Sequence, residues 1–195
     1  NGRDGRDNDP VHILVAWHVI YASSGQGNIS DLSIQQAVDG LNGAYNETFN
    51  YYFTLDTVTR TMSDEWFEVS SDSAAVYSSQ EQAMRDSLSI DPVHYYNVYS
   101  VKTLASGGWI TLGWNYFPMW NIESSIWQGT TIHYQYINSG TLPHEAGHYV
   151  GLFHTFQGGC SGANDAVDDT PAMSEDAIYS CDQNQDSCPN DPGYD

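Results

Sequence analysis

Residues 141–154 read Thr-Leu-Pro-His-Glu-Ala-Gly-His-Tyr-Val-Gly-Leu-Phe-His, and the rest of the chain is interpreted outward from this stretch. His144 and His148 are four residues apart, so on a helix their side chains lie on one face and both imidazoles can reach a single metal ion. Glu145 directly follows the first histidine and reaches the same cavity. The spacing therefore predicts a helix that carries two metal ligands and one carboxylate able to act on water.

The residues after this helix predict a third ligand. Gly151 lies three residues past His148, where a glycine can adopt the left-handed backbone conformation that ends a helix. The chain then turns back and offers His154 as a third imidazole. Three nitrogen ligands with a fourth position left for water describe a catalytic zinc site, since structural zinc sites use four protein ligands.

The complete pattern is more specific than its first half. A His-Glu-x-x-His run alone arises by chance fairly often, but the added glycine and third histidine fix five positions, which random chains of this length match in roughly 1 in 10^5 cases. The alternative is a surface helix whose histidines bond to water or to protein groups. We interpret the stretch as a zinc site with His144, His148 and His154 as ligands and Glu145 as general base.

The motif is similar to that of the metzincin zinc peptidases, and the residues after it narrow the resemblance to the pappalysin family. The resemblance is densest from residue 141 to residue 191 and looser before. The segments that carry it are 154–162, 165–171, 186–189 and, upstream, 11–21, 97–99 and 112–118. It implies a secreted zinc-dependent endopeptidase that hydrolyses peptide bonds, with a peptide or protein as substrate.

Three cysteines, all after the motif, are an odd count for a secreted protein. The resemblance implies that Cys160 pairs with Cys188 and that Cys181 pairs with a cysteine beyond Asp195. The alternative is a reduced trio in a cytosolic protein, but loops with several cysteines fit an oxidising compartment better.

An acidic loop follows the first cysteine. Asp165, Asp168 and Asp169 place three carboxylates within five positions, and such charges repel unless water or a cation separates them. The resemblance implies calcium in this region, with Asp165, the Val167 carbonyl and Thr170 as ligands. The alternative is an exposed acidic loop without a bound ion.

The composition is typical of a globular protein with an unusual charge. Apolar residues make up 40% of the chain, which includes 14 Tyr and 6 Trp, so a core can form. The net charge is −20 with only five Lys and Arg, which disfavours nucleic acid and anionic membranes as partners. No apolar run approaches the ~18 residues of a membrane span, and the first ten residues are not a signal peptide. We expect a secreted chain, so that a signal peptide and any propeptide were removed or left out of this sequence.

The periodicity of apolar residues predicts an α/β (α+β) fold, and the resemblance implies a metzincin. We expect a mixed, twisted five-stranded sheet packed by two or three helices, among them a backing helix and the active-site helix. Strands are expected at 11–21, 51–59, 94–101, 109–114 and 130–136, and helices at 31–45, 74–88 and in the motif. The alternating segment 130–136 is expected at an edge, but either it or 109–114 could pair with extended substrate.

The chain is expected to divide into three parts. Residues 1–10 form a flexible N-terminal segment, residues 11–154 an N-terminal metzincin subdomain with the zinc helix, and residues 155–195 an irregular, disulfide-tied C-terminal subdomain. Metzincins have a methionine turn beneath the zinc, and Met173 lies too early to supply it. We therefore expect that turn beyond Asp195, with the C-terminal subdomain incomplete.

Two alternatives to a peptidase stay open. One is a metzincin-like binding protein that holds zinc without turnover, which the missing methionine turn favours and the presence of Glu145 disfavours. The other is a zinc hydrolase that acts on a non-peptide bond such as an ester.

Overall fold

The structure is a computed structural model that describes residues 10–70, 78–104, 110–161, 165–167, 170–178 and 185–188. The chain divides into an N-terminal unit, residues 1–150, and a C-terminal unit, residues 151–195. The strands are β1 (Val11–Tyr21), β2 (Tyr51–Met62), β3 (Glu68–Ser70), β4 (Tyr95–Leu104), β5 (Gly113–Asn115) and β6 (Thr130–His133). The helices are α1 (Asp31–Phe49), α2 (Asp64–Phe67), α3 (Ser79–Leu88) and α4 (Thr141–Tyr149), with short 3-10 turns η1 (Pro118–Trp120), η2 (Gly159–Ser161) and η3 (Glu175–Ala177).

The strands of the N-terminal unit form one sheet of order β2-β1-β4-β6-β5, and β3 pairs with β4 beside this path. The pairs β1–β2, β1–β4, β3–β4 and β4–β6 are parallel, and β5 pairs antiparallel with β6. This is the mixed α/β sheet that the sequence predicts. The strand predicted at 11–21 is confirmed at both ends, because its buried β-branched run fits the inside of a parallel sheet.

Two predictions about the strands were wrong. The sheet has six strands rather than five, because Glu68–Ser70, where no strand was expected, pairs with β4. The segment 130–136 is a strand only over Thr130–His133, and it lies between β4 and β5 rather than at an edge. Its polar side chains suggested a half-exposed strand, but all four strand residues are buried. Strand β5 forms this edge of the sheet. It overlaps the predicted strand 109–114 only at Gly113 and Trp114, and residue 109 lies outside the described residues.

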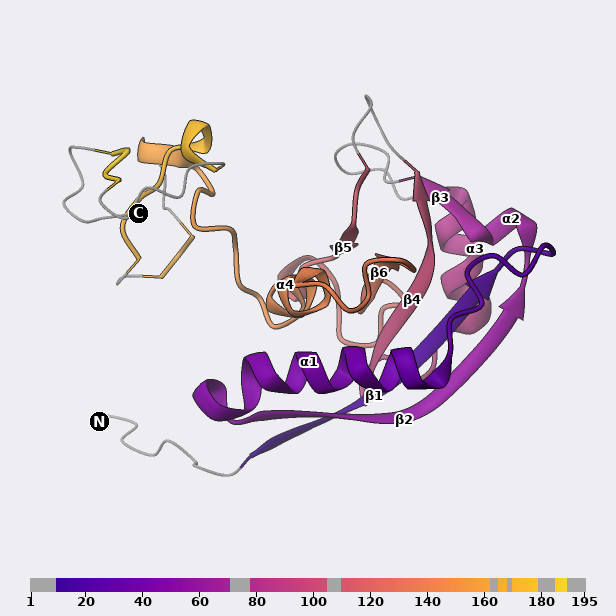
Figure 1. Cartoon of the computed structure of the whole chain (residues 1–195). Coiled ribbons are helices and arrows are strands. Elements are labelled where there is room, and N and C mark those ends of the chain that lie inside the picture. The colour runs from indigo at the N-terminus through magenta and orange to yellow at the C-terminus, as the bar shows by residue number, and fades with distance from the viewer. Residues whose placement is uncertain are drawn as a thin grey trace. The chain divides into compact units, whose positions relative to one another are not determined.

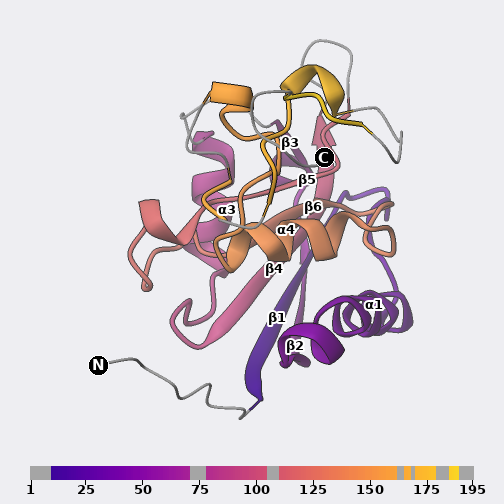
Figure 2. The same cartoon turned by 90° about the vertical axis from the view of Figure 1, so that its left-hand side faces the viewer.

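Apolar side chains on the two faces of the sheet form two cores. On one face Trp17 of β1 packs with residues of α1 and α4. On the other face Ile20 of β1 packs with Phe67 of α2 and Met84 of α3. In Figure 1, α1 runs along one side of the strands, and Figure 2 shows α1 and α3 on opposite sides of β1 and β4. Both faces are thus covered, as is usual for parallel strands.

Helix α1 fixes the start of the motif helix. It begins where the Ser30 side chain accepts a hydrogen bond from the backbone N–H of Ser33, and it ends one turn later than predicted, at Asn50 with a φ of 59°. Its Tyr45 hydroxyl donates to the Pro143 carbonyl at 2.7 Å. This bond ties α1 directly to the first turn of α4.

Among the described residues of the C-terminal unit, the helical segments are the short 3-10 turns η2 and η3. A disulfide joins Cys160 to Cys188, the pair that the resemblance implies. Cys181 lies outside the described residues. None of the described helices is long and apolar enough to cross a membrane. The expected subdomain limits, 11–154 and 155–195, stay a prediction.

A buried histidine joins three strands inside the sheet. His18 of β1 is completely buried, with Nε2 2.9 Å from Asn97 Oδ1 and Nδ1 2.8 Å from Thr59 Oγ1. A carboxamide oxygen only accepts, so Nε2 carries the proton and the Thr59 hydroxyl donates to Nδ1. Burial lowers the pKa of His18 to about 4 and outweighs the bond to Asn97, which raises it.

Acid is expected to destabilise the protein through His18. The unfolded chain binds a proton at this histidine with a pKa of 6.5, so stability is full above that pH and falls as the pH drops toward 4. The loss is about 1.4 kcal/mol per pH unit, or about 3 kcal/mol at pH 4. Chemical denaturation at pH 7.5 and 4.5 measures it. The loss should shrink in His18→Asn but not in His94→Asn, which changes an exposed histidine; an equal loss in both variants would contradict the assignment.

Candidate metal centre

Helix α4 carries the first two histidines of the motif. Leu142 and Ala146 are completely buried in the core of the N-terminal unit, which fixes how the helix is rotated against the sheet. The helix ends at Val150, and Gly151 has a φ of 99°. The predicted glycine stop is therefore confirmed, since few other residues adopt this conformation without strain.

The two histidine rings of α4 face each other. Nε2 of His144 lies 3.1 Å from Nε2 of His148, and the rings meet at 84° with centroids 4.7 Å apart. Neighbouring corners of a tetrahedral zinc site with Zn–N bonds of about 2.0–2.1 Å lie about 3.3 Å apart. Burial, and then the neighbouring His148, lower the pKa of His144, which favours the neutral form that binds metals. The pair fits zinc in distance, and the lowered pKa of His144 suits a ligand.

Glu145 is a buried carboxylate aimed at the same region. The residue is 5% exposed, and its Oε2 has no hydrogen-bond partner within the described part of the chain. Burial raises the pKa of Glu145 to about 8, and a divalent cation beside it would lower that pKa again. An unpaired buried oxygen is costly, so the geometry calls for a water molecule, a substrate group or a cation at this position.

The third histidine of the motif belongs to the same cluster. One ligand nitrogen from each of His144, His148 and His154 lies within 4.8 Å of the other two. The His154 ring also stacks on Phe156, with centroids 4.7 Å apart. The structure therefore contains the histidine triad that the sequence predicts, while the assignment of its members as ligands stays a prediction.

A cavity of about 530 Å³ opens beside this cluster in the N-terminal unit. Its walls include Gly113 of β5, Thr141 of α4, and the side chains of His144 and Glu145. A Cβ atom on Gly113 would lie 3.1 Å from the Thr131 carbonyl oxygen and 3.2 Å from Glu145 Cγ. The edge strand therefore lies directly against the carboxylate, and a larger residue at position 113 would have to move one of them.

The region predicted to bind calcium forms a local turn. Asp165 is 7% exposed, and its Oδ1 accepts from the backbone N–H of Val167 at 3.0 Å. The Val167 carbonyl accepts from the N–H of Thr170 at 3.2 Å. Asp168 and Asp169 lie outside the described residues, and calcium binding stays a prediction.

A second polar cluster beside β5 was not predicted. Glu81 and Arg85 form a buried ion pair on α3, and Glu81 also bonds Trp114 and Tyr116. The one available signal was the four-residue spacing of opposite charges in a predicted helix, in a chain with five basic residues. That spacing is usual for exposed pairs, so it did not point to a buried one.

Comparison with known proteins identifies the family. The model of the pregnancy-associated plasma protein-A peptidases, family M43, matches residues 78–194. An extracellular metalloprotease of Neurospora crassa is 34% identical over 199 residues, which cover 95% of this chain and 65% of that protein. An extracellular metalloprotease of Pyricularia oryzae is 34% identical over 200 residues, which cover 95% of this chain and 62% of that protein. The chain thus spans just under two thirds of the length of these relatives.

Solved structures support the fold. Mirolysin in complex with compound 9 superposes with a TM-score of 0.67 at 23% identity, covering 85% of this chain and 73% of that one. Tannerella forsythia mature mirolysin in complex with a cleaved peptide superposes with a TM-score of 0.64 at the same identity and coverage. The likeness confirms the metzincin fold class. Because the family match spans residues 78–194, more than half of the sequence, this chain belongs to the pappalysin family of metallopeptidases.

Proposed function

We propose that this chain carries the catalytic centre of a secreted zinc-dependent endopeptidase. The observation that carries the proposal is the pair of Nε2 atoms 3.1 Å apart on α4, next to a buried carboxylate whose Oε2 lacks a partner among the described residues. Secretion is supported by the names of the relatives, which are extracellular metalloproteases, and by the disulfide between Cys160 and Cys188.

The three histidines are the proposed zinc ligands. A zinc ion held by His144, His148 and His154 supplies Lewis acidity, which polarises a peptide carbonyl and makes water a stronger acid. Neutral imidazole nitrogens are preferred ligands of zinc. The chain's own contribution is to hold these nitrogens close together on a helix end that Gly151 closes.

Glu145 is the proposed general base and then general acid. Its Oε2 accepts a proton from the attacking water while the water oxygen bonds to the carbonyl carbon. The same oxygen next donates that proton to the amide nitrogen as the C–N bond breaks. Burial raises the pKa of Glu145, and a zinc ion beside it would lower that pKa, so the two opposing effects would let the carboxyl take up and release the proton.

The cavity beside Glu145 and the edge strand β5 are the proposed substrate contacts. Within the described residues β5 pairs with β6 on one side only, so its other edge can pair with an extended peptide. Leu112 and Gly113, at the start of β5, line the cavity with Thr141 and Glu145. A peptide aligned on β5 would pass next to the carboxylate.

Metal removal tests the proposal. The purified chain is incubated with a denatured protein, before and after chelation and again after adding zinc. We expect hydrolysis to fall to background on chelation and to return with zinc. Full hydrolysis by a zinc-free preparation would contradict the proposal, and a zinc-loaded chain that cleaves only an ester substrate would replace peptide hydrolysis with another reaction.

The same experiment bears on calcium, which we propose is bound by Asp165, the Val167 carbonyl and Thr170. Support comes from the oxygen-rich turn and the buried carboxylate. Calcium added after chelation should raise the melting temperature of the chain, whereas zinc alone should restore hydrolysis. A melting temperature that calcium leaves unchanged would remove the calcium proposal without affecting the zinc proposal.

A further inference from the structure

The buried ion pair on α3 has more polar partners than a packing role requires. Glu81 and Arg85 lie one helical turn apart with side chains 2% and 0% exposed, and Arg85 Nε donates to Glu81 Oε1 at 2.9 Å. Apolar residues of similar volume often stabilise a fold as well as a buried ion pair does, because burying two charges is costly. Stability alone therefore does not account for this pair.

The arginine side of the pair is hydrogen-bonded to residues on and just before β6. Its Nη1 donates to the carbonyl of Ile126, and its Nη2 donates to the carbonyl of Gly129 and to Thr131 Oγ1, at 3.2, 3.3 and 2.9 Å. The guanidinium also lies over aromatic rings, with centroids 4.6, 5.3 and 5.6 Å from its carbon. These rings belong to Tyr99, Tyr116 and Trp127. Such a fixed guanidinium holds the Glu81 carboxylate in one place.

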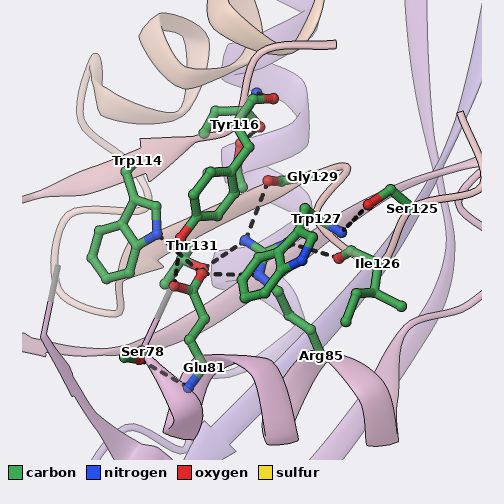
Figure 3. Close-up of polar contacts among 12 residues, drawn as sticks. Ser78, Glu81, Arg85, Trp114, Tyr116, Ser125, Ile126, Trp127, Gly129 and Thr131 are labelled. Carbon is green, nitrogen blue, oxygen red and sulfur yellow. Dashed lines mark hydrogen bonds and ion pairs between the residues drawn. The ribbon is translucent and has the colours of Figure 1, made fainter. Parts of the chain in front are cut away.

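The carboxylate side of the pair binds the edge strand. Glu81 Oε1 accepts from the Trp114 indole N–H at 3.0 Å and from the Thr131 hydroxyl at 2.9 Å, and Oε2 accepts from the Tyr116 hydroxyl at 2.7 Å. Figure 3 shows Trp114, Tyr116 and Thr131 converging on this carboxylate, with Arg85 beside it. Burial, and then the charge of Glu81, raise the pKa of Tyr116, so its hydroxyl stays protonated as a donor.

Strand β5 depends on these contacts for its position. It has three residues and pairs, within the described part of the chain, with β6 alone, and so short a strand has few ladder bonds of its own. Trp114 lies in β5 and Tyr116 directly follows the strand, and two residues apart in extended backbone lie on the same side. Both reach Glu81, while Gly113 next to them lies against Glu145.

We propose that Glu81 and Arg85 are positioning residues of the peptidase, which hold β5 through Trp114 and Tyr116 so that an extended peptide can pair, beside Glu145, with the edge of β5 that no described strand occupies. This inference rests on the proposed function. It predicts that loosening β5 weakens the binding of peptides long enough to pair with the strand. Chemistry on a short substrate, which reaches only the residues around Glu145, should change little.

Tyr116→Phe and Trp114→Phe test the inference, because each removes one hydrogen bond to Glu81 and keeps an aromatic ring. Glu81→Ala is unsuitable alone, since it leaves the buried charge of Arg85 without its carboxylate and is expected to destabilise the whole fold. The matched control is Tyr95→Phe, which removes a hydroxyl that donates to Asp56 at 3.0 Å. Asp56 lies in β2, at the opposite end of the sheet from β5. Steady-state kinetics are measured with an octapeptide and with a minimal blocked dipeptide, and amide hydrogen exchange is followed over residues 113–117.

We expect the two variants to raise KM for the octapeptide about tenfold, the scale of one hydrogen bond to a charged group, with kcat within about twofold. KM for the dipeptide should stay unchanged, and amides 113–117 should exchange faster, while Tyr95→Phe matches the wild type. An unchanged KM for the octapeptide, or an equal rise in KM for both substrates, overturns the positioning role. If the wild type cleaves neither substrate when loaded with zinc, the proposed function fails instead, which separates the two failures.

Discussion

Replacing Glu145 by alanine is expected to abolish most peptide hydrolysis while leaving zinc binding intact. General acid–base groups contribute about 10²–10⁴-fold to rate, and Glu145 would serve in both proton transfers, so we expect kcat to fall by about 10³–10⁴-fold. Glu145→Gln should lose nearly as much, because the amide keeps the shape of the side chain but cannot accept and return the proton. Initial rates on a denatured protein measure the loss, and elemental analysis measures the zinc.

The matched control for this result is Glu65→Gln, which changes an exposed glutamate on α2 and should retain wild-type rates. A Glu145→Gln variant that keeps kcat within about tenfold of the wild type would show that another group moves the proton. Loss of zinc from the same variant would mean that Glu145 acts by holding the metal site together rather than on water.

Replacing His148 by alanine is expected to remove the metal. His148 is 8% exposed, and its Nε2 lies 3.1 Å from that of His144, so its loss would leave the proposed site with two imidazoles. Changes in groups that only orient a metal ligand weaken binding by about 10–100-fold, so loss of a ligand should weaken zinc binding by more than about 100-fold. Competition with a zinc-binding dye measures the affinity.

The chain offers a control for this change as well. His94→Ala removes an exposed histidine whose Nδ1 lies 2.8 Å from Asp91, and it should keep wild-type affinity for zinc. If His148→Ala and His94→Ala bind zinc equally well, the metal is held elsewhere on the chain. Retained hydrolysis in His148→Ala would contradict the zinc mechanism directly.

The sequence predicts most of the features that depend on residues close together in the chain. The strand at 11–21 is correct at both ends because its largely apolar, β-branched run is typical of a strand, and its residues 15–20 are completely buried. The helix stop at Gly151 follows from backbone sterics, which glycine satisfies whatever the fold. The histidine cluster is predictable because helix geometry alone brings His144 and His148 to one face.

What the sequence does not predict depends on contacts between distant segments. Three-residue strands such as β3 and β5 are too short to show a period, so their pairing follows from the surrounding sheet. Burial of the polar strand β6 depends on Arg85 and Glu81, which satisfy Thr131 from 46 and 50 residues away. The hydrogen bonds between α3 and the residues of the edge strand also join positions far apart in the sequence, so local patterns do not predict them.

Zinc-edge X-ray absorption on the zinc-loaded chain tests the central claim most directly, because it counts the imidazoles bound to the metal. We predict three imidazole nitrogens at about 2.0–2.1 Å and one further light-atom ligand, and loss of this three-imidazole signal in His148→Ala. A spectrum with fewer than three imidazoles, or one that His148→Ala leaves unchanged, would contradict the assignment of His144, His148 and His154 as the zinc ligands.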